Sequence, residues 1–236
     1  MLMNKRAMKM RIGQFVSLVA SVLMLSACSS QTRPPSESAG TQTAAELKLC
    51  NTCLQLCSSC HYTNGTSAGP EFPKIAGQKE VYLVKAVENF KEGKRDSETM
   101  QAIAKLHTKE EMIKLARYFA SLQPDNTPSI SATDEAQWEW GKIIYEKDRI
   151  YGISCADCHG YNGMGYTYEG PKMRNVRAIP RLAGQSRTYL ASGVQRYVDG
   201  KYDAGMCTMR KAGTTLSQDD VNALIEYLAS LTPPKS

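Results

Sequence analysis

The chain has 236 residues, enough for one large domain or two small ones, and its 42% hydrophobic and 22% charged residues are typical of a globular protein. Four of its 29 Lys and Arg residues fall within the first eleven positions, so the rest of the chain sets 25 basic residues against 23 acidic ones. This mild charge comes with no cluster of basic and aromatic side chains, which argues against nucleic-acid binding.

Residues 1–27 have the pattern of an export signal. The four basic residues precede an uncharged stretch at 12–25, which at 14 residues is shorter than the ~20 that a membrane-spanning helix needs. This stretch ends in Leu25-Ser26-Ala27-Cys28, which resembles a bacterial lipobox and predicts lipidation of Cys28, followed by a flexible polar tether over 28–45. Ser29 favours sorting to the outer membrane by the same resemblance. We therefore expect a periplasmic lipoprotein; the alternative is an ordinary signal peptide with an incidental cysteine.

Helices are the secondary structure that the sequence predicts beyond the tether. Two of them are marked by a capping hydroxyl followed three residues later by an acid, at Thr108 with Glu111 and at Ser217 with Asp220. Apolar residues recur behind both caps at helical spacing, and no segment alternates long enough to predict a sheet. In chain order, the predicted helices cover residues 43–56, 81–90, 108–122, 135–148, 189–198 and 217–231.

The sequence is duplicated with an offset of 107 residues. "FPKIAGQKEVYLVKAVENFKEGK" at 72–94 matches "IPRLAGQSRTYLASGVQRYVDGK" at 179–201 in its Pro, Ala-Gly-Gln, Tyr-Leu and Gly-Lys positions. This self-similarity indicates two domains of one fold, predicted over 46–122 and 135–236 and joined by a linker at 123–134. Each half is small for a core of side chains alone, so we expect a bulky apolar cofactor to complete its interior.

Each half carries one Cys-x-x-Cys-His motif, which is the attachment sequence of c-type haem. Two cysteines three residues apart on a helical turn can form thioethers with one porphyrin, and the next residue then directs its imidazole at the iron. A zinc site needs four ligands, whereas this chain has only three histidines, and a dithiol enzyme does not need the trailing histidine. The motifs predict two covalently attached haem c groups, one held by Cys57, Cys60 and His61 and the other by Cys155, Cys158 and His159.

A methionine is the predicted second axial ligand of each haem iron. Met100 and Met209 each lie eight residues before the capping hydroxyl of a predicted helix, and no other methionine pair matches across the halves. Met206 is a substitute candidate for Met209, and His107, the remaining histidine, is expected to face solvent. A thioether ligand favours ferrous iron and so raises the reduction potential. Iron ligated on both faces has no open position for oxygen or peroxide, which indicates electron transfer rather than bond chemistry.

The motifs "CSSCH…FPKIAGQ…M…T" and "CADCH…IPRLAGQ…M…S" resemble those of the cytochrome c4 family of dihaem cytochromes c, over nearly all of the chain from about residue 46. The resemblance implies an all-α fold of two class I cytochrome c domains, each wrapped around one haem, with the haem propionates of the two domains facing one another. It also implies that the carbonyls of Pro73 and Pro180 accept hydrogen bonds from His61 and His159, which would orient the imidazoles.

The function that the resemblance implies is the carriage of single electrons in a respiratory chain, without substrate turnover. The partners would be a quinol–cytochrome c reductase or a dehydrogenase as donor and a terminal oxidase or other redox protein as acceptor. One alternative is the dihaem subunit of a flavin-dependent, sulfide-type dehydrogenase. A less favoured alternative is a dihaem peroxidase, which would need one open iron.

Two features depart from the family pattern. Cys50, Cys53 and Cys207 exceed what two haem groups need. Cys50 is interpreted first as a small residue where two helices cross; a Cys50–Cys53 disulfide and an intermolecular or regulatory role are the alternatives. The loop at 160–178 is longer than its counterpart in the first half, and we expect it at the haem rim or at the domain interface.

Overall fold

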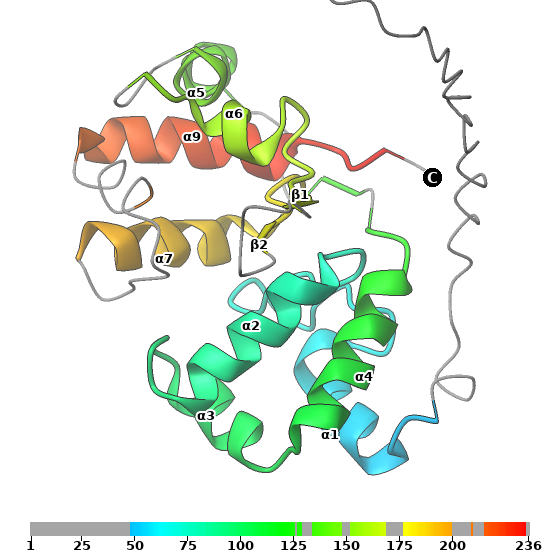
Figure 1. Ribbon diagram of the computed structural model, residues 1–236. Coiled ribbons are helices and arrows are strands. Elements are labelled where there is room, and N and C mark those ends of the chain that lie inside the picture. Colours follow the sequence, from blue (N-terminus) through cyan, green and yellow to red (C-terminus); the bar gives the residue numbers. More distant parts are fainter. Residues whose placement is uncertain are drawn as a thin grey trace, which may run out of the picture. The chain divides into compact units, whose positions relative to one another are not determined.

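The computed structural model describes residues 48–125, 127–128, 134–147, 152–168, 177–199, 209 and 215–234. The predicted signal peptide, Cys28 and the tether lie outside this part of the chain. Among the helices described, none is both long and apolar enough to cross a membrane. Helices dominate the described residues (Figure 1): α1 Asn51–His61, α2 Glu80–Lys91, α3 Glu98–Lys105 and α4 Lys109–Ser121 in the first half, and α5 Glu135–Glu146, α6 Cys155–His159, α7 Arg187–Val198 and α9 Gln218–Ser230 in the second.

The predicted capping boxes are present at the starts of α4 and α9. The hydroxyl of Thr108 accepts a hydrogen bond from the amide of Glu111, whose carboxylate accepts one from the Thr108 amide in return. Ser217 and Asp220 make the same reciprocal pair ahead of α9. Because each box satisfies two amides that a helix start leaves unpaired, it fixes where the helix begins.

Helix α1 begins later than the sequence predicted. Residues 48–50 are not helical, and Cys50 is the exposed N-cap of a helix that starts at Asn51. Cys50 forms a disulfide with Cys53. The interpretation of Cys50 as a small residue between crossing helices is therefore wrong, and the alternative of a Cys50–Cys53 disulfide is confirmed. Cys207 lies outside the described residues.

A two-stranded antiparallel ladder interrupts the helices, although the sequence predicted no sheet. Strand β1, Tyr166–Tyr168, pairs with β2, Arg177–Ile179, with Thr167 opposite Ala178. Three residues per strand are too few for an alternating pattern to be detected. Strand β1 lies within the longer loop at 160–178 and β2 begins at its end, and β2 packs against α2 of the first half. The expected position of this loop at the domain interface is therefore confirmed for β2, while residues 169–176 lie outside the described part.

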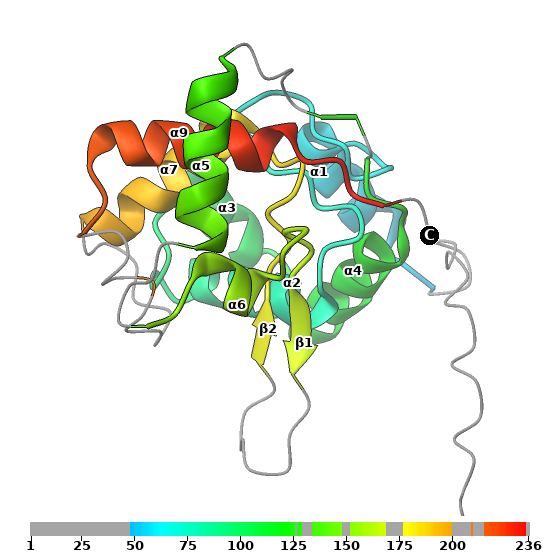
Figure 2. The same cartoon turned by 90° about the horizontal axis from the view of Figure 1, so that it is seen from above.

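In the second half α5 crosses α9 at close range (Figure 2). Gly141 permits this approach, because a Cβ at this position would come within 2.0 Å of the Ala223 carbonyl oxygen. Around the crossing lies an apolar cluster that includes Ile144, Tyr145, Leu224 and Leu228. Most of α9 is consequently buried, including Val221 and the segment from Ala223 to Ala229.

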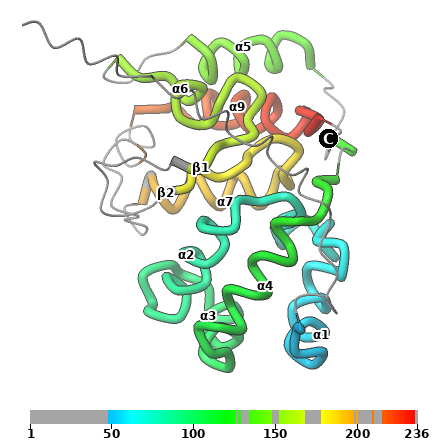
Figure 3. The backbone as a smooth tube through the Cα atoms, turned by 45° about the vertical axis from the view of Figure 1, so that its right-hand side comes forward, coloured from blue at the N-terminus to red at the C-terminus, as the bar shows by residue number. Residues whose placement is uncertain are grey.

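In the first half α2 packs against both α3 and α4 (Figure 3). The buried cluster here is small: Leu83, Ala116 and Phe119 are its members, and Cys57 packs against it from α1. A core of this size leaves the interior incomplete, as expected for a domain that wraps a cofactor. The space that these helices enclose is the cavity described next.

Candidate functional site

A cavity of about 380 Å³ opens inside the first half and extends to the second. Its volume lies in the range of cofactor sites in proteins, and most of its lining is apolar. The predicted ligands of the first haem all line it. Among the lining residues are Cys57, Cys60, His61, Pro73, Arg95, Met100, His107, Met112, Pro180, Arg181, Gln185 and Tyr189.

One wall of the cavity is formed by the last turns of α1, which present Cys57, Cys60 and His61. The Nδ1 atom of His61 lies 3.1 Å from the carbonyl oxygen of Pro73, as expected. With Nδ1 donating to this carbonyl, Nε2 is left as the nitrogen with a lone pair for a metal. Burial lowers the pKa of His61, which favours the neutral imidazole that ligation requires. Burial also raises the pKa of the Cys57 thiol, to about 11.

The second half repeats this arrangement around α6. A capping box between Ser154 and Asp157 starts the helix, so that Cys155, Cys158 and His159 follow within five residues. The Nδ1 atom of His159 lies 3.1 Å from the carbonyl oxygen of Pro180, the same distance as in the first half. Burial lowers the pKa of His159 as well. Both predicted histidine–proline contacts are thus present.

Helix α3 brings Met100 to the cavity, one turn after its N-cap Ser97. The sequence had not predicted this helix. The structure describes Met209, which is half-buried, but not the residues on either side of it, 200–208 and 210–214. The pairing of Met209 with His159 therefore stays a prediction, and Met206 lies outside the described residues.

The expectation that His107 faces solvent is wrong. Its side chain is only 8% exposed and lines the same cavity as Met100. The Nδ1 atom lies 3.7 Å from a carboxylate oxygen of Glu111, and Nε2 is buried with no hydrogen-bond partner among the described residues. The position of His107 directly before a helix cap predicts exposure. The chain turns inward before α4 begins, however, and His107 is buried.

Comparisons with known proteins identify the family. The family model described as cytochrome c matches residues 51–128 and again 139–232. A cytochrome c4 of Pseudomonas aeruginosa is 30% identical over 181 residues, covering 75% of this chain and 84% of its own. The crystal structure of reduced recombinant cytochrome c4 from Pseudomonas stutzeri superposes with a TM-score of 0.63 at 25% identity, over 76% of this chain and 97% of that one. The chain belongs to the cytochrome c family, and within it to the dihaem cytochromes c4.

A third relative is named thiosulfate dehydrogenase electron acceptor, from Thiomonas intermedia; it is 26% identical over 185 residues, covering 76% of this chain and 81% of its own. The predicted all-α fold of two cytochrome c domains is confirmed by these matches. As a cytochrome c4, the chain carries two covalent haem c groups and is an electron-transfer protein rather than an enzyme.

The residues of the cavity fit an anionic macrocycle such as haem. Arg181 is 1% exposed, and its guanidinium donates to carbonyl oxygens of Ala183 and Ala76 at 2.6 and 3.0 Å. Its Nε has no hydrogen-bond partner among the described residues. Burial lowers the pKa of Arg181 to about 10, so the side chain remains a cation at neutral pH. A buried cation bonded only to neutral carbonyls suits the carboxylates that a haem carries at its edge.

The two cytochrome domains join through the duplicated Ala-Gly-Gln motif, a role that the sequence did not reveal. The side chain of Gln78 accepts a hydrogen bond from the Arg181 amide at 2.8 Å and donates to the Arg181 carbonyl at 3.1 Å. Its counterpart Gln185 accepts from the Lys74 amide at 2.7 Å and donates to the Lys74 carbonyl at 2.9 Å. Because Lys74 and Arg181 are themselves counterparts in the repeat, the contact has the symmetry of a two-fold axis.

A second cross-domain contact lies beside the cavity. Arg95 donates to the hydroxyl groups of Tyr82 and Tyr189, at 3.3 and 2.5 Å, and these tyrosines are again counterparts in the repeat. Ser186 adds a hydrogen bond from its hydroxyl to the carbonyl of Pro70. The two domains thus meet around Arg95 and Arg181, two of the charged residues that line the haem cavity.

Proposed function

We propose that this cytochrome c4 is a lipid-anchored carrier on the periplasmic side of a bacterial membrane. It takes single electrons from a quinol-linked complex or a dehydrogenase and delivers them to a terminal oxidase or another redox acceptor. The observation that best supports the electron-carrier function is the repeated geometry of the two Cys-x-x-Cys-His motifs. In each of them the histidine Nδ1 lies 3.1 Å from a proline carbonyl.

In this proposal Cys57, Cys60, Cys155 and Cys158 would form the thioethers to the two haem groups, and His61 and His159 would each bind one iron. The carbonyls of Pro73 and Pro180 hold the imidazole rings so that each presents Nε2 as the ligating atom. Met100 and Met209 would supply the second protein ligand of each iron. When bound, haem would supply an iron that gains or loses one electron, and a histidine together with a methionine at each iron would leave no open position for water or peroxide.

A dehydrogenase that oxidises reduced sulfur is a specific candidate for the donor. A relative named thiosulfate dehydrogenase electron acceptor matches 76% of this chain, which supports a reaction of this class as the source of electrons. The flavin-dependent dehydrogenase subunit remains the second candidate. A cytochrome subunit would co-purify with a flavoprotein in fixed ratio, whereas a mobile carrier would purify alone.

The test of the carrier function is made on protein exported from a host that attaches haem. We expect an intact mass raised by two haem groups, a low-spin spectrum without added ligand, and a redox titration with two one-electron steps. Rapid peroxide turnover or a high-spin ferric signal in the wild type would instead support the peroxidase alternative. A mass without two haem groups would refute the proposal as a whole.

The anchor is tested separately through Cys28, which lies outside the described residues. We expect the wild type in the membrane fraction and Cys28→Ser in the soluble periplasmic fraction, because acyl chains on this cysteine would be the attachment. Fractionation with haem staining measures the distribution. Equal release of both proteins would refute lipid anchoring and leave the electron-carrier function untouched.

A further inference from the structure

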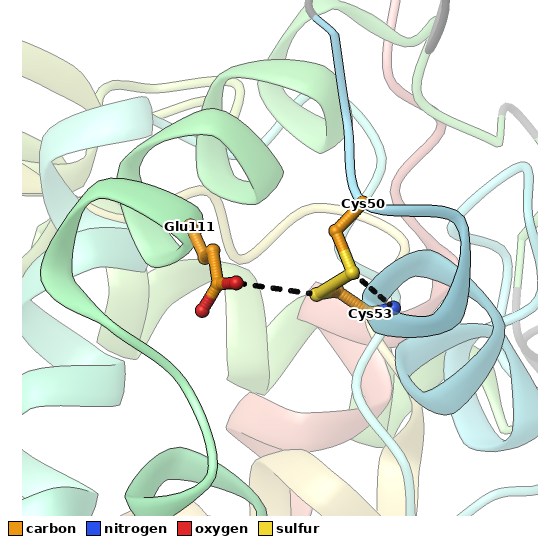
Figure 4. A group of neighbouring side chains, drawn as sticks. All are labelled: Cys50, Cys53 and Glu111. Carbon is orange, nitrogen blue, oxygen red and sulfur yellow. Dashed lines mark hydrogen bonds between the residues drawn. A yellow bond between two sulfur atoms is a disulfide. The ribbon is translucent and has the colours of Figure 1, made fainter.

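The Cys50–Cys53 disulfide lies at the start of α1, one helical turn before the first haem-binding cysteine. It has no part in either Cys-x-x-Cys-His motif. The two cysteines are drawn in Figure 4. They differ in exposure: Cys50 is exposed, whereas Cys53 is 7% exposed. The amide of Cys53 donates to Cys50 Sγ at 3.2 Å.

This asymmetry makes Cys50 the sulfur that an incoming thiolate can reach. Attack at Cys50 Sγ would expel Cys53 as the leaving group. Cys50 also occupies the N-cap of an 11-residue helix, where the amide of Cys53 and the positive end of the helix dipole stabilise a thiolate. Cys50 is therefore accessible and is stabilised as a thiolate when it is released, whereas Cys53 is its buried partner.

Glu111 places a carboxylate beside the buried sulfur. Its Oε2 caps α4 and accepts from the amide and the hydroxyl of Thr108 at 2.8 and 3.0 Å. Its other oxygen, Oε1, lies 3.7 Å from Cys53 Sγ (Figure 4). A sulfur at this distance donates to a carboxylate only when it carries a proton, so the contact becomes a hydrogen bond once the disulfide is reduced.

The second domain shows that this placement is not a by-product of helix capping. Asp220 caps α9 with Oδ2, as Glu111 caps α4. Its other oxygen, Oδ1, accepts a hydrogen bond from the indole N–H of Trp140 at 2.9 Å. In the first domain the equivalent oxygen faces a disulfide instead. Only the carboxylate of the first domain is therefore positioned to exchange a proton with sulfur.

A cavity of about 340 Å³ gives access to the pair. It adjoins the haem cavity at Leu115, which lines both, but its own lining is mostly polar. The charged side chains around it are of both signs, which suits a polar reductant rather than an apolar ligand. Besides the two cysteines and Glu111, its lining includes Lys48, Leu49, Thr108, Glu110, Lys114 and Leu115.

We propose that Cys50–Cys53 is a redox-active disulfide that exchanges with a dithiol, either a small molecule or an exported dithiol protein. A thiolate of the reductant attacks Cys50 Sγ, the Cys50–Cys53 bond breaks, and Cys53 leaves as a thiolate that takes a proton from water. The second thiol of the reductant loses its proton and attacks its own bridged sulfur, which releases the Cys50 thiolate. Two electrons pass from the dithiol to this pair, and the dithiol becomes a disulfide.

Glu111 acts in the oxidising direction. When Cys50 forms a mixed disulfide with an oxidised partner, Cys53 must lose its proton in order to attack Cys50 Sγ. The Oε1 atom of Glu111 accepts that proton, and the partner leaves as a thiolate. Glu111 is thus a positioned base for the closure of the disulfide, in addition to its role as a helix cap.

The test uses the holoprotein with Cys28→Ser and Cys207→Ser, so that Cys50 and Cys53 are the cysteines left outside the two haem-binding motifs. Oxidised protein is incubated with dithiothreitol or with reduced thioredoxin, alkylated, and mapped by mass spectrometry under native conditions. We expect two alkylated thiols, at Cys50 and Cys53. Reduction by both reagents supports an exported protein partner, and reduction by dithiothreitol alone supports a small dithiol. A disulfide that opens only after unfolding would overturn the proposal.

Variants separate the roles of the residues. Cys53→Ser, incubated with oxidised thioredoxin and quenched with acid, should form a mixed disulfide at Cys50, because the Cys50 thiolate attacks the thioredoxin disulfide and one thioredoxin cysteine leaves as a thiolate; Cys50→Ser should form none. Glu111→Gln should slow reoxidation of the reduced pair by roughly tenfold or more. Asp220→Asn weakens the equivalent cap of α9 and should leave that rate unchanged. Equal rates in Glu111→Gln and the wild type, or equal slowing in both variants, would contradict the role of Glu111.

Discussion

The imidazoles of His61 and His159 each make one hydrogen bond to a proline carbonyl. A proline carbonyl 3.1 Å from Nδ1 fixes the ring orientation, and burial lowers the pKa of both histidines, so that each is ready to bind metal without first losing a proton. His107 is also buried, but its Nδ1 faces the Glu111 carboxylate rather than a carbonyl. The two histidines of the first domain, His61 and His107, therefore lie in different environments.

The methionine assignment is tested at the same scale. Met100→Ala should remove one of two sulfur–iron charge-transfer bands at the red end of the spectrum and lower one of the two reduction potentials, because a neutral thioether favours ferrous iron. Absorption spectroscopy and a redox titration measure both effects. Met112→Leu is the matched control, since Met112 also lines the cavity but belongs to α4. Sulfur–iron charge-transfer bands of unchanged intensity in Met100→Ala would show that another residue binds the iron.

His107 shows why residue-level prediction from sequence has a limit. The Cys-x-x-Cys-His motifs specify their chemistry by spacing alone, and the structure places them as expected. The burial of His107 depends instead on how the chain turns between α3 and α4, a tertiary feature with no local sequence signal. The same holds for Arg181, whose fully buried guanidinium sits in a segment with no apolar pattern.

Helix packing depends on a glycine at one crossing. Gly141 lies where α5 meets α9, and a Cβ there would come within 2.0 Å of the Ala223 carbonyl oxygen and 2.6 Å of its carbon. The neighbour is backbone of a buried helix, so it cannot move aside as a flexible side chain would. Gly193 in α7 offers a contrast: its Cβ would meet only the end of Arg196, at 3.9 Å.

This contrast makes a matched prediction. Gly141→Ala should lower the free energy of unfolding by about 1–3 kcal/mol, because the two helices must separate to admit a methyl group. Gly193→Ala should raise it by roughly 0.5–1 kcal/mol, because alanine costs less backbone entropy in a helix. Guanidinium denaturation of the holoproteins, followed by far-UV circular dichroism, measures both. Equal effects of the two substitutions would contradict the close crossing.

At the scale of elements, sequence periodicity and capping chemistry predicted most of what was found. Helices α2, α4, α5, α7 and α9 lie where apolar spacing and cap residues placed them. The start of α1 was missed because Cys50 forms a covalent bridge that the helical pattern cannot reveal. The β1–β2 ladder and α3 were missed because three residues and eight residues are too short for a periodic signal.

At the scale of the whole molecule, duplication supplies both the domains and the contact between them. Gln78 and Gln185 occupy the same position of the repeat, and each pairs with the backbone of the other domain at Arg181 and Lys74. The sequence showed that both halves contain Ala-Gly-Gln. It could not show that the two copies face each other, because a repeat carries no information on how its units are oriented.

The contact made by Gln78 and Gln185 predicts how far the stability of each domain depends on the other. Gln78→Ala should lower the free energy of unfolding by about 1–3 kcal/mol, because the buried amide and carbonyl of Arg181 lose their partners. Gln185→Ala should have a similar effect at Lys74. Gln123→Ala, at an exposed position, is the control and should stay within about 0.5 kcal/mol of the wild type.

The double variant Gln78→Ala/Gln185→Ala carries the prediction further. The hydrogen bonds of both glutamines belong to one interface. The losses of unfolding free energy in the two single variants should therefore not add, because removing one set of bonds already loosens the other. The wild type should unfold in a single transition, and the double variant in two, because each domain then unfolds around its own haem. Guanidinium titration followed at the Soret band and by far-UV circular dichroism distinguishes these cases. A single transition with an unchanged midpoint in the double variant would mean that these glutamines do not couple the domains.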